Sequence, residues 1–255
     1  MQTSIDAFLD GRFTLEQPRT GPRTGLDALL LAAIVPLLVD RPERVLDAGC
    51  GCAPIALSIA TRFPLAHITG VERESKIVDL ARRNVAHNHM EESVSIIEAD
   101  LIKPLGEMQG ERQGHRLEPQ SFQHVVANPP FYRHDQSRSC KDERKSAAHR
   151  LQDGELAQWI RFLTAMAAPK ASISLIHRPE ALPELLELCK GRFGGLKIAP
   201  VFSTPDGAAI RILVQGTKGS RAPMALMKGV VLREEDGNYN MQVEAVLREG
   251  KPLRI

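Results

Sequence analysis

The stretch ANPPFYR (127–133) combines residue types that could hold an amino group in place for a reaction. Pro129 and Pro130 fix the backbone angle φ and remove two N–H donors, so the loop is stiff and offers mainly acceptors. The side-chain oxygen of Asn128 and the backbone carbonyl of Pro129 could accept both hydrogens of a planar NH₂ group. Phe131 adds an aromatic face on which a planar base or amide could stack. Taken alone, however, the four residues also fit a turn with a hydrophobic plug, because Asn-Pro commonly opens turns.

The chemistry that such an acceptor-rich loop favours is methylation of an exocyclic amine. Such an amine is a weak nucleophile because its lone pair is delocalised into the ring. Hydrogen bonds from both N–H groups strengthen as the nitrogen becomes tetrahedral, so they lower the barrier as well as holding the substrate. With a sulfonium methyl donor, the reaction would be an in-line displacement to which positioning contributes most. No strong general base is required, and the sequence offers no obvious candidate.

A second group of residues could bind a nucleotide-like cofactor. Asp47 ends a predicted strand, and Gly49 and Gly51 follow it in VLDAGCGCAPIAL, where the backbone can approach a ligand closely at the start of a helix. Glu72 ends the next predicted strand, where a carboxylate can accept hydrogen bonds from ribose hydroxyls. Asp100 follows the third strand and could accept a hydrogen bond from an adenine amine. This order predicts methionine, ribose and adenine contacts on three successive strand ends.

Two cofactors use this layout, a dinucleotide and S-adenosylmethionine. The dinucleotide pattern G-x-G-x-x-G/A would require Gly or Ala where Pro54 stands. The alternative pattern, an acid two residues before G-x-G-x-G, matches at Asp47, with Ala53 in place of the third glycine. A carboxylate suits a ligand with an ammonium group and is a poor neighbour for a pyrophosphate. We therefore expect S-adenosylmethionine as cofactor and S-adenosylhomocysteine as product.

The elements that position these residues alternate along the chain. Apolar runs predict strands at 45–48, 67–72, 94–99, 124–127 and 171–177, and helical spacing predicts helices at 54–63, 75–88, 154–167 and 183–195. Ser75 is the candidate N-cap of the second helix, and the last helix is expected to end at glycine. LKIAPVFS and AAIRILVQG read as a closing pair of strands. This alternation predicts a doubly wound, mostly parallel α/β sheet with helices on both faces, in which ligands lie beyond the carboxyl ends of the strands.

Three regions are expected along the chain: an N-terminal segment and helix (1–40), a core (41–216) and a C-terminal appendage packed on the core (217–255). Two polar loops interrupt the core, at 103–121 and 133–150. The second is rich in Lys and Arg, so it could meet RNA phosphates or could be a solvated loop.

Composition limits the alternatives. The chain has 255 residues, of which 43% are hydrophobic, enough for a packed core, and a net charge of +2, which permits a nucleic-acid partner without requiring one. Four cysteines (Cys50, Cys52, Cys140 and Cys189) show no zinc-ligand spacing, so we expect no metal. The first residues do not resemble a secretory signal, and the apolar run at 26–39 is too short to cross a bilayer. We therefore expect a cytoplasmic protein without a membrane partner; the sequence does not indicate its oligomeric state.

The motifs resemble those of class I S-adenosylmethionine-dependent methyltransferases that carry the amino-methylation motif [DNS]-P-P-[FYW]. The resemblance covers roughly residues 20–216 and is strongest to bacterial tRNA adenine-N6 methyltransferases that modify the anticodon loop of a valine tRNA. It rests on QPRTGPRTGLDALLLAA (17–33), VLDAGCGCAPIAL and ANPPFY. It implies a seven-stranded, Rossmann-like sheet whose last strand is antiparallel. It further implies that the residues of the NPPF motif hold the target amine and that Asn128 also borders the cofactor, which is bound by Asp47, Gly49, Gly51, Glu72 and Asp100.

Two departures from the pattern bear on the substrate. Ala53 replaces the third glycine, which is a mild change because Ala is small. Phe131 stands where adenine-N6 and protein-glutamine methyltransferases more often have Tyr, and where guanine-N2 methyltransferases of rRNA often have Phe. We therefore expect methylation of adenine N6 in a structured RNA, first of all tRNA. Guanine N2 in rRNA, adenine in DNA, a protein glutamine, and a cofactor- or RNA-binding module without catalysis stay open as alternatives.

Overall fold

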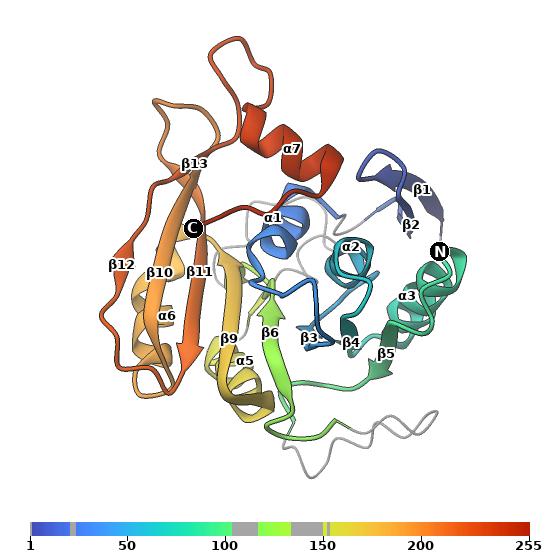
Figure 1. Cartoon of the computed structure of the whole chain (residues 1–255), viewed down its shortest axis with the longest axis horizontal. Helices are drawn as coiled ribbons and strands as arrows, with labels where there is room; N and C mark the ends of the chain where they lie inside the picture. The colour runs from blue at the N-terminus through green and yellow to red at the C-terminus, as the bar shows by residue number, and fades with distance from the viewer. Residues whose placement is uncertain (1, 21–23, 104–116, 134–149, 152–153) are drawn as a thin grey trace.

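A central β-sheet with helices on both faces forms the fold (Figure 1). The structure is a computed structural model that describes residues 2–20, 24–103, 117–133, 150–151 and 154–255. Seven strands of the sheet have five or more residues: β3 (Arg44–Ala48), β4 (His67–Glu72), β5 (Val94–Glu98), β6 (Phe122–Ala127), β9 (Ala167–His177), β10 (Phe193–Phe202) and β11 (Ala209–Lys218). The helices are α1 (Leu26–Ile34), α2 (Pro54–Arg62), α3 (Ser75–His87), α5 (Glu155–Met166), α6 (Leu182–Cys189) and α7 (Met241–Glu249), with a 3₁₀ turn at Pro179–Ala181.

The strand order is β5-β4-β3-β6-β9-β11-β10. Parallel pairing joins β5, β4, β3, β6 and β9, whereas β11 runs antiparallel to both β9 and β10. The predicted doubly wound α/β fold with an antiparallel last strand is confirmed. Because β3 has β4 on one side and β6 on the other, the direction of winding changes at β3, which is where such sheets bind ligands.

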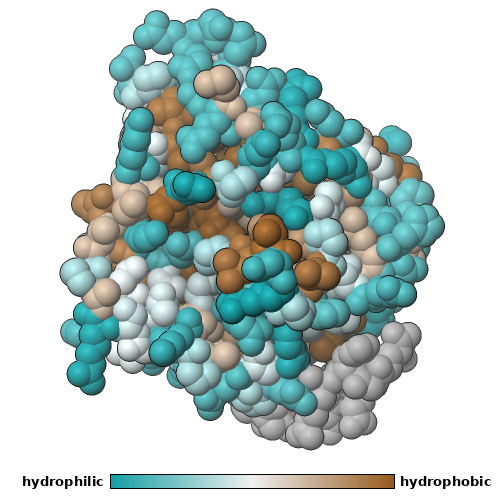
Figure 2. Space-filling view, in the orientation of Figure 1, coloured by the Kyte–Doolittle hydropathy of each residue, from teal (hydrophilic) through white to brown (hydrophobic). Residues whose placement is uncertain are grey.

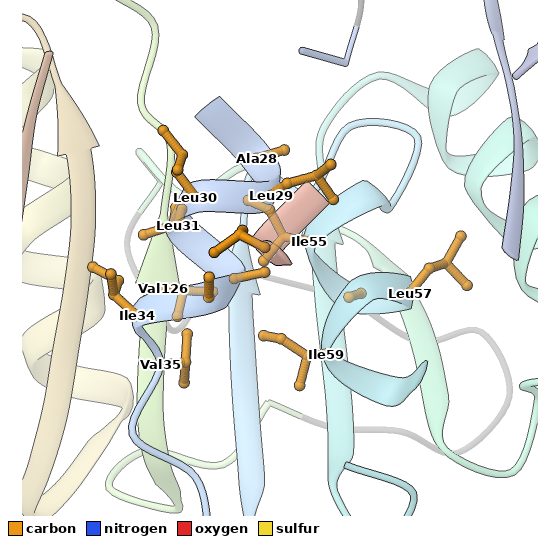
Figure 3. Packing of buried hydrophobic residues seen from close by; sticks show 14 of the residues in the cluster. Ala28, Leu29, Leu30, Leu31, Ile34, Val35, Ile55, Leu57, Ile59 and Val126 are labelled. Atoms are coloured by element: carbon orange, nitrogen blue, oxygen red, sulfur yellow. The ribbon is translucent and has the colours of Figure 1, made fainter. Parts of the chain in front are cut away.

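Two hydrophobic layers hold the helices on the sheet. One layer contains apolar side chains of α1, α2, α3 and α7, and the other contains those of α5 and α6. Figure 3 shows apolar side chains of α1 and α2 meeting near Val126 of β6. In the view of Figure 2, hydrophilic residues cover most of the surface and a smaller group of hydrophobic residues lies toward the middle. None of the helices in the described ranges is long and apolar enough to cross a membrane.

The segment after β11 adds to the sheet. Two-residue strands, β12 (Ala225–Leu226) and β13 (Val230–Val231), pair in parallel with β10, so the main sheet has nine strands in the described residues, two short strands beyond the seven that the resemblance implied. The difference arises because the chain runs back along the free edge of β10 after leaving β11. Beyond α7, the amide of Leu253 donates a hydrogen bond to the carbonyl of Ala33 at 3.0 Å, which ties the C-terminal segment to α1.

An N-terminal hairpin that the sequence did not predict packs beside α3. Its strands are β1 (Thr3–Phe8) and β2 (Phe13–Pro18). The outer edge of β2 would leave backbone groups unpaired, but the side-chain oxygen of Asn84 accepts from the amide of Glu16 at 2.7 Å, and that of Asn88 accepts from the amide of Thr14 at 2.8 Å. A third small sheet joins β7 (Tyr132–Arg133) to β8 (Arg150–Leu151) in parallel.

Two local predictions are wrong. Glu74 occupies the N-cap position of α3 without a capping hydrogen bond from its side chain, and Ser75 is the first helical residue. The amides of Arg73 and Glu74, just before the helix, donate to the carboxylate of Glu72 at the end of β4. Helix α6 ends at Cys189, and the residues read as its glycine end belong to β10. There Gly194 lies so close to the carbonyl of Ser220 that an added Cβ would come within 2.1 Å of its oxygen. Gly194 therefore allows the backbone of Ser220 to approach β10 closely. Most of the two predicted polar loops lies outside the described residues.

Candidate active site

The glycine loop between β3 and α2 has a backbone that most residues adopt only under strain. Gly49 has φ +67°, and a Cβ there would lie 2.3 Å from the ring of Trp159 in α5, so both conformation and space require glycine. Ala53, the N-cap of α2, has φ 70°. The left-handed conformation costs an L-residue about 1–2 kcal/mol, which explains why a third glycine suits this pattern and why alanine is a tolerable replacement. The amide of Cys50 donates to the carbonyl of Val71 at 2.9 Å and ties the loop to β4.

Asp47 lies just before this loop and is fully buried. Neither of its carboxylate oxygens has a hydrogen-bond partner within the described residues. Burial, with a smaller contribution from the negative charge of Glu72, raises the pKa of Asp47 from 3.8 to about 7, and the nearby backbone amide of Ala56, which does not reach hydrogen-bond geometry, opposes this rise. A buried carboxylate of this kind is costly unless a cation or donor accompanies it, so the position fits a ligand that brings an ammonium group.

Glu72 contacts the glycine loop directly. One carboxylate oxygen accepts from the amide of Gly51 at 3.2 Å, and the other accepts from the amides of Arg73 at 2.8 Å and Glu74 at 3.0 Å. A carboxylate has about four acceptor positions, so these three bonds leave capacity for a ribose hydroxyl. Glu72 is therefore fixed by the backbone on both sides, in a position from which it can still accept.

Asp100 lies beyond the end of the neighbouring strand. The amide of Ala99 donates to the carbonyl of Glu72 at 2.9 Å, which places the two strand ends side by side. One oxygen of Asp100 accepts from the amide of Ile102 at 3.2 Å within its own loop. Asp100 is thus held next to the Glu72 strand end.

Asn128 follows β6, on the other side of β3. The register pairs Ala48 with Ala127, so Asn128 continues from the strand end opposite the glycine loop. Its side-chain oxygen is buried and has no hydrogen-bond partner in the described part of the structure. Asp47 and Asn128 thus leave unpaired acceptor oxygens on two adjacent strands.

Two residues that the sequence patterns did not single out as functional contact Phe131, and a third pairs with one of them. The ring of His177, at the end of β9, meets it in a T-shaped arrangement with 5.1 Å between centroids. The guanidinium carbon of Arg211, in β11, lies over the Phe131 ring at 4.8 Å from its centroid. The Nε of Arg211 in turn donates to a carboxylate oxygen of Asp27, in the first turn of α1, at 2.8 Å.

Comparison with known proteins identifies the family. Residues 26–158 match the model of the methyltransferase small domain family. The chain belongs to that family. It is a methyltransferase that uses S-adenosylmethionine, as the residues at the ends of β3 and β4 predicted.

Individual relatives give the range of similarity. The methyltransferase is 27% identical over 211 residues to the tRNA1(Val) (adenine(37)-N6)-methyltransferase of Porphyromonas gingivalis, covering 82% of this chain and 79% of that one. It is 34% identical over 142 residues to the protein of the same description from Yersinia pestis, covering 55% of this chain and 52% of the relative. Among solved structures, a predicted O-methyltransferase of Agrobacterium tumefaciens superposes with a TM-score of 0.69 at 26% identity, covering 90% of this chain and 99% of that one.

The carboxylates at the ends of β3, β4 and β5 fit the cofactor of the methyltransferase. S-adenosylmethionine supplies an electrophilic methyl group on a sulfonium centre when it is bound. Asp47 would accept from its ammonium group, Glu72 from its ribose hydroxyls and Asp100 from its adenine amine, as the order of the strand ends suggests. The glycine loop allows the backbone to approach closely.

The cysteines of the glycine loop are unsuited to nucleophilic catalysis. Both Cys50 and Cys52 are buried. Burial raises the pKa of the Cys50 thiol well above its usual value and that of Cys52 to about 12, so both stay protonated near neutral pH. Within the described residues, no group of three or more His, Cys, Asp or Glu side chains is arranged to hold a metal ion.

Proposed function

We propose that this methyltransferase transfers a methyl group to an exocyclic amine of a structured RNA, with adenine N6 in tRNA as the first candidate. The observation that carries the proposal is the buried oxygen of Asn128, which has no hydrogen-bond partner among the described residues and is followed at once by two prolines without N–H groups. An isolated buried acceptor costs about 1–3 kcal/mol, so its retention favours a ligand that supplies a donor. An amino group supplies two donors to a site that offers acceptors only.

The residues of the NPPF motif would act by holding and polarising that amine. Asn128 accepts one N–H group through its side chain, and Pro129 accepts the other through its backbone carbonyl. As the nitrogen attacks, it gains positive charge and its N–H groups become better donors, so these hydrogen bonds are stronger in the transition state than in the ground state. Phe131 stacks on the ring that carries the amine and limits its rotation.

Support for tRNA as the substrate comes from the relatives. The Porphyromonas gingivalis and Yersinia pestis proteins are both described as acting on an adenine N6 of a valine tRNA. The first of these is matched over 79% of its length, so most of that protein has a counterpart in this chain. Support for a second candidate, guanine N2 in rRNA, comes from Phe131, because the guanine-N2 methyltransferases resemble this chain at that position.

The test compares the candidate amines directly. Purified protein is incubated with labelled S-adenosylmethionine and, separately, with unmodified valine tRNA transcript, rRNA, DNA and a glutamine-containing peptide, and the products are resolved by nucleoside or peptide mass spectrometry. We expect N6-methyladenosine in the tRNA. N2-methylguanosine in rRNA would replace the first candidate by the second, and methylglutamine or methylated DNA alone would contradict an RNA substrate.

A further inference from the structure

Phe131 is held by a chain of contacts that joins three distant parts of the sequence. The guanidinium of Arg211 lies over its ring, and the Nε of Arg211 is bonded to Asp27 at 2.8 Å. A second guanidinium nitrogen donates to the carbonyl of Ile210 at 2.8 Å, which fixes the orientation of the planar group. The side chains of Arg211 and Asp27 are only 27% and 24% exposed, so solvent screens their interaction less than that of a surface pair.

The elements that carry these residues converge on the carboxyl end of the parallel strands. Asp27 is in the first turn of α1, where the helix dipole also favours a carboxylate. Arg211 is near the start of β11, and Ile212 pairs with His177 at the end of β9. Since β11 is antiparallel to β9, the start of β11 lies at the same edge of the sheet as Asn128 and Phe131.

We propose that Arg211 and Asp27 are positioning residues for methyl transfer: Arg211 sets the ring of Phe131 for the target base, and Asp27 neutralises the charge that Arg211 brings. This proposal rests on the proposed function, because it gives Phe131 the role of a platform for a base. Neither residue belongs to the NPPF motif or to the glycine loop.

The need for neutralisation follows from the direction in which charge moves. Methyl transfer carries positive charge from sulfur to the target nitrogen. An unpaired guanidinium beside the platform would raise the energy of that change, since two like charges repel strongly where water is scarce. A carboxylate 2.8 Å from the guanidinium cancels most of that field while leaving the planar cation stacked on the ring.

His177 adds no second positive charge at this place near neutral pH. Burial lowers its pKa to about 4. Its Nδ1 accepts a hydrogen bond from the amide of Arg178 at 2.9 Å, which places the ring proton on Nε2. Of the described side chains that contact the Phe131 ring, Arg211 therefore brings the positive charge, and Asp27 pairs with it. Arg178 and Glu184 add one charge of each sign near His177.

The test uses Arg211→Met, Asp27→Asn, the double variant and a matched control. Arg44→Met is the control, because Arg44 also lies over a phenylalanine ring, that of Phe122 at 4.9 Å, and also pairs with a carboxylate, that of Glu118 at 3.7 Å. Arg44 begins β3 and so lies at the opposite edge of the sheet. Four quantities are measured: kcat/KM with RNA, affinity for S-adenosylhomocysteine, thermal stability, and the ¹⁹F NMR signal of 4-fluorophenylalanine at position 131.

Arg211→Met is expected to lower kcat/KM roughly tenfold and to shift the fluorine signal, with unchanged affinity for S-adenosylhomocysteine. Asp27→Asn is expected to lower kcat/KM further than Arg211→Met, because it leaves the cation uncompensated, and the double variant is expected to return to the level of Arg211→Met. Arg44→Met should change neither kcat/KM nor the fluorine signal.

Three results would overturn the proposal. The fluorine signal could be unchanged in Arg211→Met, or the kcat/KM losses of the two single variants could add in the double variant. The third is a loss of kcat/KM in Arg211→Met no larger than that in Arg44→Met when both variants lose the same thermal stability. Failure of the proposed function is seen separately. If the unmodified protein methylates no RNA, the proposed function is wrong. The fluorine signal alone then decides whether Arg211 and Asp27 fix the orientation of the Phe131 ring.

Discussion

Asp47 and Asn128 bury acceptor oxygens that have no hydrogen-bond partner in the described ranges, and they lie at the ends of adjacent parallel strands in which Ala48 pairs with Ala127. Each such group costs stability in the free protein. Both unpaired groups lie where the sheet changes its direction of winding, and this is the place where a cationic cofactor and an amino substrate would meet. Because Asp47 suits the ammonium group of the cofactor and Asn128 suits the amine of the substrate, their neighbouring positions bring the two ligands together.

The raised pKa of Asp47 predicts how cofactor binding depends on pH. Its carboxyl group has a pKa of about 7 in the folded protein and 3.8 ordinarily, so the folded state holds an extra proton between these values and loses stability as pH rises through this window. An ammonium ligand favours the ionised form. We therefore expect affinity for S-adenosylhomocysteine to fall, approaching tenfold per pH unit, as pH is lowered below about 7.

The matched variant is Asp47→Asn, which has no group to titrate at this position. Calorimetry between pH 5.5 and 8 should show weaker binding that hardly varies with pH, and greater stability than the unmodified protein above pH 7. A pH dependence that survives in Asp47→Asn would assign the titration to another group.

Alanine at Gly49 and alanine at Gly51 should lower the free energy of unfolding by different amounts. Gly49→Ala should destabilise the protein by about 2–4 kcal/mol, because the new methyl group meets Trp159 and the backbone is left-handed. Gly51→Ala should cost only about 1–2 kcal/mol, because φ is +54° but nothing lies within 4 Å of the added Cβ. Urea unfolding of both variants measures the difference. Equal losses would show that the contact with Trp159 is relieved at little cost.

Substitution of Glu72 tests whether its carboxylate binds the ribose of the cofactor. Glu72→Ala should weaken S-adenosylhomocysteine binding at least tenfold, because it removes a ribose acceptor and also frees the amide of Gly51. Glu74→Ala is the control, since Glu74 is exposed and its side chain makes no capping hydrogen bond to α3. Titration calorimetry with both variants checks this. Binding of NAD in place of the homocysteine product would contradict the assignment of the strand ends.

The sequence predicted the parts of the site that depend on local pattern. The strand-end positions of Asp47, Glu72 and Asp100 are confirmed, because each lies at the end of a short apolar run, and such runs become strands whose ends meet at one edge of the sheet. The hairpin was missed although Asp10-Gly11 in its turn is a hairpin signal, since Leu9, Asp10 and Gly11 all have positive φ.

The contacts that hold the Phe131 ring could not be predicted from local sequence patterns. Asp27 and Arg211 are 184 residues apart in the sequence and meet only through the packing of α1 against the sheet. Gly194 misled the helix prediction for a related reason, since the backbone that requires it belongs to Ser220, a later part of the chain. Contacts of this kind leave no periodic pattern in the sequence.

The most direct test of amine methylation compares Asn128→Ala with Asn128→Asp. Both variants should still bind S-adenosylhomocysteine, because Asp47, Glu72 and Asp100 are intact. Asn128→Ala removes the acceptor, so methyl transfer to RNA in single-turnover assays should fall by about 10²–10³-fold. Asn128→Asp keeps an acceptor oxygen in the same space and should retain measurable transfer. Transfer by Asn128→Ala at the rate of the unmodified protein would contradict the account.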